Sequence, residues 1–235
     1  MGQYWLLFNL DKSEYSECGG AKMGELFYNV SETWILNLLL SGQPNHDVWG
    51  GDRIVLLGDY SQALPPNTVA DDDSAVLKKC VATDQSKSSQ GICAYDTLRK
   101  YGKEKTRVTR TSSLLHPDTV YALRSHEKKE YVRRDVVRDY RKFPESCSPG
   151  LAQALFTLVG WSEDPSAALM YNDDDYIPAS GGTTVPLHRG AWAGNRIDIV
   201  ALTDEVQKSF DEEGWVDISE EKARHVSDVY ACDDY

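Results

Sequence analysis

The sequence predicts an α+β fold in which a unit of β-hairpin, helix and strand occurs twice, with the two copies packed about a pseudo-two-fold axis. Two observations support this prediction. The stretches VWGGDRIVLLGDY (48–60) and AWAGNRIDIVALTD (191–204) share a Trp, a small-residue turn, an acid or amide, an Arg and an apolar run. The segments DKSEY (11–15) and EKKEY (127–131) also match, each at the turn of an expected hairpin.

The first unit is expected over residues 1–60. An apolar and aromatic run at 4–10, followed by a turn and a return strand, is typical of a β-hairpin. Apolar residues at helical spacing predict a helix over 23–38, or alternatively a shorter helix over 32–41 that Ser31 caps and Gly42 ends. The four consecutive apolar residues at 54–57 predict a strand that is covered on both faces.

An insertion is expected between the two units, at residues 61–118. Little of this segment is apolar, and only 75–80 and 93–101 have patterns suited to short helices. The remainder is expected to form a long loop.

The second unit is expected over residues 119–204. A second hairpin begins it, and Pro149 suits the first position of a helix. Ile197 and Ile199 alternate with Asp198, which predicts a more exposed strand than the one at 54–57.

Residues 205–235 complete the chain with two helices, which we expect to be capped by Thr203 and Ser219. The four segments together are expected to form one compact domain of 235 residues.

Bulk composition narrows the classes of protein. The net charge of −12 argues against nucleic acid as a partner, and no apolar run is long enough to cross a membrane. The five cysteines follow no CxxC spacing and no export signal precedes the first strand, which favours reduced thiols and a cytoplasmic location. Because no dinucleotide, phosphate-loop or metal-ligand motif is found, we expect no cofactor and no metal.

Several blocks of the chain resemble an uncharacterised family found in fungi, with shorter relatives in bacteria, whose members begin MGQYW or MGQYY. The resemblance is carried by MGQYW with NLDK (1–12), WGGDRIVLLGDY (49–60), GWSEDPSAALMY (160–171) and HRGAWAGNRIDI (188–199). It implies no catalytic residues, since the family has no established activity. It does imply that the second turn usually reads WAGDR, so that Asn195 replaces an Asp here.

The two Trp-Gly turns supply the candidate ligand-binding residues. Arg53 and Arg196 precede the apolar strands and are expected to converge on an anion such as phosphate or carboxylate, because a guanidinium binds such groups bidentately. Trp49 and Trp192 are expected to form aromatic walls of the same cleft. In the structural alternative, the tryptophans pack in the core and each arginine pairs with a nearby acid.

Two histidines precede these turns and supply the candidate catalytic residues. His46 lies three residues before the first turn Trp, and His188 four before the second. In one interpretation either histidine acts as a general base that Asp52 or Asp59 orients. In the other, they are ordinary loop histidines.

Two functions therefore remain open. The favoured one is an intracellular protein without catalytic activity that binds a small molecule or a protein partner in an anion-binding, aromatic-walled cleft between the repeats. The alternative is a hydrolase-like or isomerase-like enzyme for a small molecule. It would use the His and Asp residues for acid–base chemistry and the arginines to hold an anionic group.

Overall fold

The computed structural model describes residues 3–21, 23–29, 32–41, 48–81, 93–105, 116, 118–140, 149–164 and 188–231. Within these ranges the protein is a mixed α+β fold with one open sheet of nine strands and eight helices. The α+β class is therefore the one that the sequence predicts.

The strands run in a mixed order across the sheet. They are β1 (Gln3–Asn9), β2 (Glu14–Ala21), β3 (Asp52–Gly58), β4 (Lys103–Glu104), β5 (Tyr121–Ser125), β6 (Glu130–Arg133), β7 (Gly160–Trp161), β8 (Arg196–Ala201) and β9 (Val216–Asp217). Their order is β4-β2-β1-β3-β8-β5-β6-β9, and β7 pairs with β3 beside this path.

The same series of pairings is met from either edge of the sheet toward its centre. A parallel pair comes first, formed by β4 with β2 at one edge and by β9 with β6 at the other. An antiparallel hairpin follows, β2 with β1 and β6 with β5, and then a second antiparallel pair, β1 with β3 and β5 with β8. At the centre β3 and β8 meet antiparallel, with Arg53 opposite Arg196.

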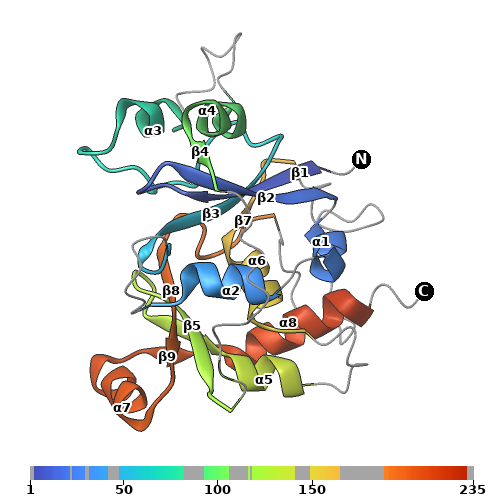
Figure 1. Ribbon diagram of the computed structural model, residues 1–235, viewed down its shortest axis with the longest axis vertical. Coiled ribbons are helices and arrows are strands. Elements are labelled where there is room, and N and C mark those ends of the chain that lie inside the picture. Colours follow the sequence, from blue (N-terminus) through green and yellow to red (C-terminus); the bar gives the residue numbers. More distant parts are fainter. Residues whose placement is uncertain are drawn as a thin grey trace.

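Helices cover both faces of the sheet. They are α1 (Met23–Asn29), α2 (Glu32–Leu39), α3 (Ala75–Lys79), α4 (Ala94–Tyr101), α5 (Arg134–Asp139), α6 (Leu151–Val159), α7 (Asp204–Glu213) and α8 (Ser219–Ala231). The largest core cluster joins one face of the sheet to α1, α2, α5, α6 and α8. On the other face, α3 and α4 cover the β1–β3 half and α7 covers the β5–β8 half. Figure 1 shows α3 and α4 near one end of the molecule and α7 near the other.

The central strand β3 has apolar residues on both sides because helices cover both faces of the sheet there. Ile54 and Leu56 belong to the large core, whereas Val55 and Leu57 pack in the smaller cluster under α3 and α4. A strand with covered faces needs apolar residues at successive positions, because neighbouring side chains point to opposite faces. The prediction of a doubly covered strand at 54–57 is confirmed.

Several other elements match or correct the sequence-based expectations. The hairpin over 4–10 and the short helices near 75–80 and 93–101 are present as β1–β2, α3 and α4. The segment 23–38 holds two helices, α1 and α2, and α2 lies within the alternative helix predicted over 32–41. Ser31 and Gly42, proposed to cap and end it, lie outside the described residues.

Of two predictions for the second half of the chain, one was wrong and one is confirmed. Ser219 is the first residue of α8 and not its cap; its hydroxyl donates a hydrogen bond to the Asp217 carboxylate. Strand β8 is more exposed than β3, as predicted, since Arg196 is exposed and Val200 and Ala201 are half-buried, although Asp198 is only 3% exposed. Its carboxylate lies under α7, where it binds the guanidinium of Arg124.

In the part of the chain that the structure describes, no helix is both long enough and apolar enough to cross a membrane.

We predict that the buried His225 makes stability fall between neutral and mildly acidic pH. The His225 side chain in α8 is 5% exposed, and burial lowers its pKa from 6.5 to about 4. The unfolded chain therefore binds a proton at His225 over a pH range in which the native protein does not. The contribution of the neutral imidazole is complete above pH 6.5 and is lost as pH falls toward 4.

Urea denaturation of the native sequence and of His225→Gln at pH 7 and pH 5 measures this effect. The wild-type protein should lose roughly 2 kcal/mol more than the variant between the two pH values. Equal losses in the two proteins would show that His225 does not titrate in the native state as its burial requires.

Candidate functional site

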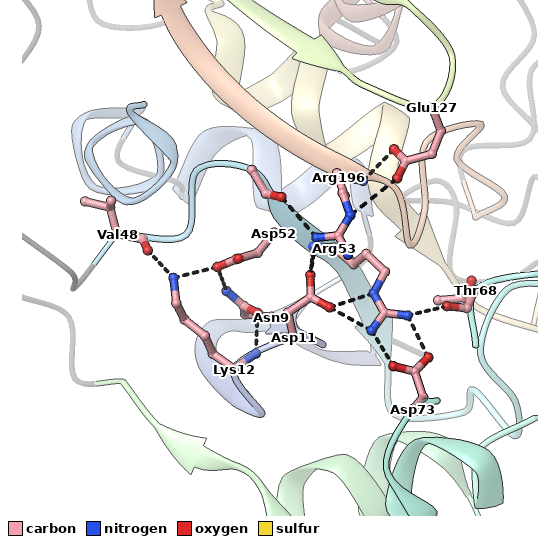
Figure 2. Close-up of polar contacts among 11 residues, drawn as sticks. Asn9, Asp11, Lys12, Val48, Asp52, Arg53, Thr68, Asp73, Glu127 and Arg196 are labelled. Carbon is pink, nitrogen blue, oxygen red and sulfur yellow. Dashed lines mark hydrogen bonds and ion pairs between the residues drawn. The ribbon is translucent and has the colours of Figure 1, made fainter. Parts of the chain in front are cut away.

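An ion-pair cluster lies at the centre of the sheet, where β3 meets β8 (Figure 2). Both central arginines reach Asp11, in the turn between β1 and β2. Arg53 Nε donates to Asp11 Oδ1 at 2.8 Å, and Arg196 Nη1 donates to Asp11 Oδ2 at 2.8 Å. Burial alone would raise the pKa of Asp11, but its hydrogen bonds with Arg53 keep that pKa below its usual value. The anion on which the two arginines converge is therefore a carboxylate of the protein itself.

Arg53 is fully engaged by the protein. Its two terminal nitrogens bind Asp73 bidentately at 2.7 and 2.6 Å, and Nη1 also donates to the Thr68 carbonyl at 2.9 Å. With the contacts from Nε and Nη2 to Asp11, these account for all five donors of the guanidinium. The hydrogen bonds from Arg53 lower the pKa of Asp73 to about 2. Arg53, 14% exposed at its side chain, therefore joins β3 to the hairpin turn and to residues 68–73.

Arg196 is more open than Arg53. Its side chain is 47% exposed, and Nη1 contacts Asp11 and, at 3.3 Å, the Gly51 carbonyl. Its Nε lies 4.0 Å from Glu127 Oε1, while its backbone N–H donates to Glu127 Oε2 at 2.7 Å. Among the described residues, Arg196 Nη2 makes no ion pair or hydrogen bond, so Arg196 keeps a donor for a further group.

The tryptophans of the two turns do not line a cleft, so their prediction as ligand-binding walls was wrong. Trp49 and Trp192 are both 0% exposed. Their indole N–H groups donate to Glu14 at 2.7 Å and to Glu130 at 2.6 Å, respectively. Each tryptophan therefore fixes its Gly turn onto the adjacent hairpin, as a buried indole with a satisfied N–H does.

Asp52 and Asn195 occupy the same place in the two turns but have different partners. Asp52 Oδ2 accepts from Lys12 Nζ at 2.6 Å and from Asn9 Nδ2 at 2.7 Å. Asn195 Nδ2 donates to Ser125 Oγ at 2.9 Å. Because its side chain is uncharged, Asn195 does not form an ion pair with a lysine as Asp52 does. Lys128 follows Glu127 as Lys12 follows Asp11, yet Lys128 has no carboxylate partner within the described ranges.

A cavity of about 380 Å³ lies beside the second turn. Its lining comes from residues 65–68, from Glu127 and Lys128 in the β5–β6 turn, from Trp161 at the end of β7, and from residues 190, 191 and 193–195 of the second turn. The cavity is thus bounded by four segments that are far apart in sequence, and Lys128 is one of its lining residues.

Among the described residues, the predicted acid–base residues His188 and Asp59 are not brought together with Asp52. His46 lies outside the described residues. His188 is buried, its carbonyl accepts from Ser162 N, and it does not line the cavity. Asp59 follows the far end of β3 from Asp52, and burial raises the pKa of its carboxyl. No group of three or more His, Cys, Asp or Glu in the described part of the chain is placed to hold a metal ion.

Sequence reasoning missed three sets of residues. Asp73 belongs to an acidic run typical of a solvated loop, and nothing in the run marks it as the partner of Arg53. Lys128 could have been found, because DKSEY and EKKEY align and Asn195 replaces the acid. Arg124, His126 and Asp198 form a contiguous ionic group on the outer face of the β5–β8 half, with His126 Nε2 3.3 Å from Asp198 Oδ2.

Comparisons of the chain with protein-family models, curated proteins and solved structures find no match in any of the three. Membership of the MGQYW family therefore stays a prediction.

We predict that the two central arginines differ in their effect on stability. Arg53→Met leaves Asp11 and Asp73 without their shared cation, and it should cost about 3 kcal/mol of unfolding free energy because both carboxylates are largely covered. Arg196→Met should cost less than about 1 kcal/mol, because this side chain is half exposed and its ion pairs are screened by water.

Urea denaturation at pH 7, analysed with a common slope, measures both changes. The two substitutions remove the same chemical group and keep a similar aliphatic stem, so each is the control for the other. Equal costs would mean that the guanidinium of Arg53 does not join the turn, β3 and residues 68–73.

Proposed function

We propose that this is a binding protein without catalytic activity, built from two similar halves about a pseudo-two-fold axis, that binds a small anionic molecule in the cavity beside the second turn. The matching bonds of the two halves support the symmetry. Gly51 N donates to the Ile197 carbonyl at 2.9 Å, and Gly194 N donates to the Ile54 carbonyl at 2.8 Å. Exchanging the two halves converts one of these bonds into the other.

The hairpin turns support the same relation. Ser13 and Lys129 are two of the few non-glycine residues with a positive φ among those described, at 53° and 51°. The carbonyl of each accepts from an edge strand, Ser13 from Lys103 N at 2.9 Å and Lys129 from Val216 N at 2.8 Å. An energetically costly backbone conformation at equivalent positions is better explained by a common unit than by chance.

One observation carries the assignment of the ligand. In the first half, the ammonium of Lys12 is neutralised by Asp52 at 2.6 Å. In the second half, Lys128 lines a cavity, and the residue at the place of that carboxylate is the uncharged Asn195. An ammonium that has lost its counter-ion attracts an anionic group, such as a carboxylate or phosphate, into the space beside it. The neighbouring carboxylate of Glu127 does not fill this role, because it binds Arg196.

The other walls of the cavity are compatible with a small organic anion. Trp161 contributes a half-buried indole whose N–H is bound to the Ala63 carbonyl at 3.1 Å. Thr68 and the amide of Asn195 add polar groups. A concave site with an aromatic wall, one free cation and a few polar groups is the usual form of a small-molecule site. It favours a small molecule over a protein as the partner.

We further propose that the protein acts in the cytoplasm. Among the described residues, Cys80 and Cys93 are free thiols, as is usual in a reducing compartment.

We predict that Lys128→Gln weakens anion binding. Native mass spectrometry of the protein purified without added ligand shows whether a small anion is retained, and calorimetry with citrate and inorganic phosphate gives affinities. Loss of the ammonium should weaken the affinity for the retained or added anion by about five- to tenfold, the usual effect of one partly exposed charged contact. Lys129→Gln is the matched control, because Lys129 binds the Glu213 carbonyl and does not line the cavity.

Asn195→Asp tests the same proposal in the opposite direction. This substitution restores at the second turn the carboxylate that Asp52 supplies at the first, so it should neutralise Lys128 and weaken anion binding at least as much as Lys128→Gln does. Thermal unfolding should show no loss of stability. The proposal fails if both variants bind the anions like the wild type, or if wild-type protein converts metabolites in an untargeted turnover screen.

A further inference from the structure

Another cavity, of about 140 Å³, lies between the β1–β2 hairpin and helices α3 and α4, and we call it the α3–α4 cavity. Its apolar walls come from Phe8 and Leu10 of the hairpin, from Val76 and Leu77 of α3, and from Leu98 of α4. All of these except Val76 are buried. None of its lining residues also lines the cavity beside the second turn, so the two cavities are separate.

Two polar side chains in the walls of the α3–α4 cavity are already used by the protein. Asn9 Nδ2 donates to Asp52 Oδ2 at 2.7 Å, and Asn9 Oδ1 accepts from Lys12 N at 2.8 Å. Ser74 Oγ accepts from Leu77 N at 3.3 Å at the start of α3. A ligand in this cavity therefore gains chiefly apolar contacts, which favours an uncharged molecule over an anion.

The second half of the chain has a large side chain at the corresponding position. Edge strands β4 and β9 pair with their hairpins in the same register, because their first residues lie opposite Glu14 and Glu130. These two glutamates hold the same position in the matching segments DKSEY and EKKEY. The residue before β4, Gly102, therefore corresponds to the residue before β9, Trp215. Figure 1 shows β4 near α4 at one end of the molecule and β9 near α7 at the other.

Trp215 packs against α7 and the second hairpin. Its ring centroid lies 5.0 Å from that of Phe210, in a stacked arrangement, and 5.9 Å from that of His126. The guanidinium carbon of Arg124 lies 5.3 Å from the centroid of the indole. The indole is therefore surrounded by one residue of α7, one of β5 and one of the turn that follows β5.

The residues that correspond to these three all line the α3–α4 cavity. Phe8 and Leu10 correspond to Arg124 and His126, since they lie equally far before the hairpin glutamates. The third is Leu98, whose carbonyl accepts the N–H of the residue before β4 at 2.7 Å. Its counterpart in α7 accepts the N–H of the residue before β9 at 2.9 Å. The cavity of the first half therefore lies where the second half has an indole.

Gly102 explains why no side chain of residue 102 fills this place. A Cβ on Gly102 would lie 2.6 Å from the Leu98 carbonyl oxygen and 3.1 Å from Tyr15 Cδ1. The first distance is shorter than real Cβ contacts, so a side chain here would displace the backbone of α4. Tyr101 also lines the cavity and is 57% exposed, so the cavity is open to solvent on that side.

We propose that the α3–α4 cavity binds a small neutral aromatic molecule, whose ring takes the place that the Trp215 indole takes in the second half. An apolar cavity of about 150 Å³ holds a benzene-sized molecule, so a volume of about 140 Å³ fits one aromatic ring system. Burial of the ring against Phe8, Leu10 and Leu98 supplies the affinity. Binding here follows from the correspondence of the two halves proposed above and is independent of the anion beside the second turn.

Indole is the probe for this site, because it is the ring system of Trp215. Calorimetry with the full chain should show saturable binding of indole with a dissociation constant below about 1 mM. Val76→Phe, which brings a ring into the cavity from α3, should weaken indole affinity about tenfold or more, since the ligand loses its space. Val81→Phe is the matched control, because Val81 is 44% exposed and does not line the cavity.

NMR spectra of the wild-type protein with labelled leucine methyl groups locate the ligand without any substitution. Indole should shift the methyl signals of Leu10, Leu77 and Leu98, which line the cavity. The signals of Leu123 and Leu158, which are buried in the large core, should stay unchanged.

The Lys128→Gln variant separates this site from the function proposed for the cavity beside the second turn. It should bind indole with the affinity of the wild type, because Lys128 does not line the α3–α4 cavity. The aromatic site would be overturned by the absence of saturable binding to the wild-type protein, by unchanged affinity in Val76→Phe, or by methyl shifts confined to other leucines. None of these three outcomes bears on anion binding at Lys128.

Discussion

The meeting of β3 with β8 is the constraint on which the rest of the structure depends. Only two rungs pair directly, Asp52 with Ile197 and Arg53 with Arg196, yet they join two sets of strands into one sheet. The contact is extended by N–H groups of Gly51 and Gly194, whose φ angles of +88° and +82° favour glycine. At Gly194 a Cβ would also lie 2.5 Å from the side chain of Thr68, so the turn fits closely against the wall of the cavity.

The Arg53 cluster fixes segments that the hydrogen bonds of the sheet do not hold. Asp11, Arg53 and Asp73 are separated by 42 and 20 residues in the chain. Backbone pairing of β1 with β3 brings the turn that holds Asp11 close to Arg53, but residues 68–73 are not part of the sheet. The bidentate contact with Asp73 and the bond to the Thr68 carbonyl hold them against β3. Thr68 lines the cavity. The ion pair of Arg53 with Asp73 therefore helps to determine the shape of the cavity, although Arg53 has no donor left for a ligand.

The sequence predicts the strands and helices better than the chemistry of the site. Covered strands and short helices leave a periodic pattern of apolar residues, which is why 54–57 and 93–101 could be assigned. The structural alternative, in which each arginine pairs with a nearby acid, anticipates that Arg53 binds carboxylates of the protein, here Asp11 and Asp73. The burial of Trp49 and the choice of Asp73 over its neighbours in an acidic run depend on long-range packing. The sequence around Trp49 does not distinguish a residue that lines a cleft from one that packs in the core. The sequence around Asp73 does not distinguish an acid that binds an arginine from one that faces solvent.

The differences between the two halves direct attention to the second. If both halves derive from one unit, then equivalent positions that the backbone pairing requires should hold the same type of residue in both. Equivalent positions that hold different residues should then indicate how the two halves differ in function. In the first half, Lys12 and Arg53 form ion pairs with Asp52 and Asp73, and apolar residues such as Phe8 cover the outer face of the sheet. The second half has Asn195 beside Lys128 and an ionic group containing His126. An ionic group at a buried position lowers the apolar contribution to the free energy of folding. Its presence in the same half as Lys128 is therefore better explained by binding than by stability.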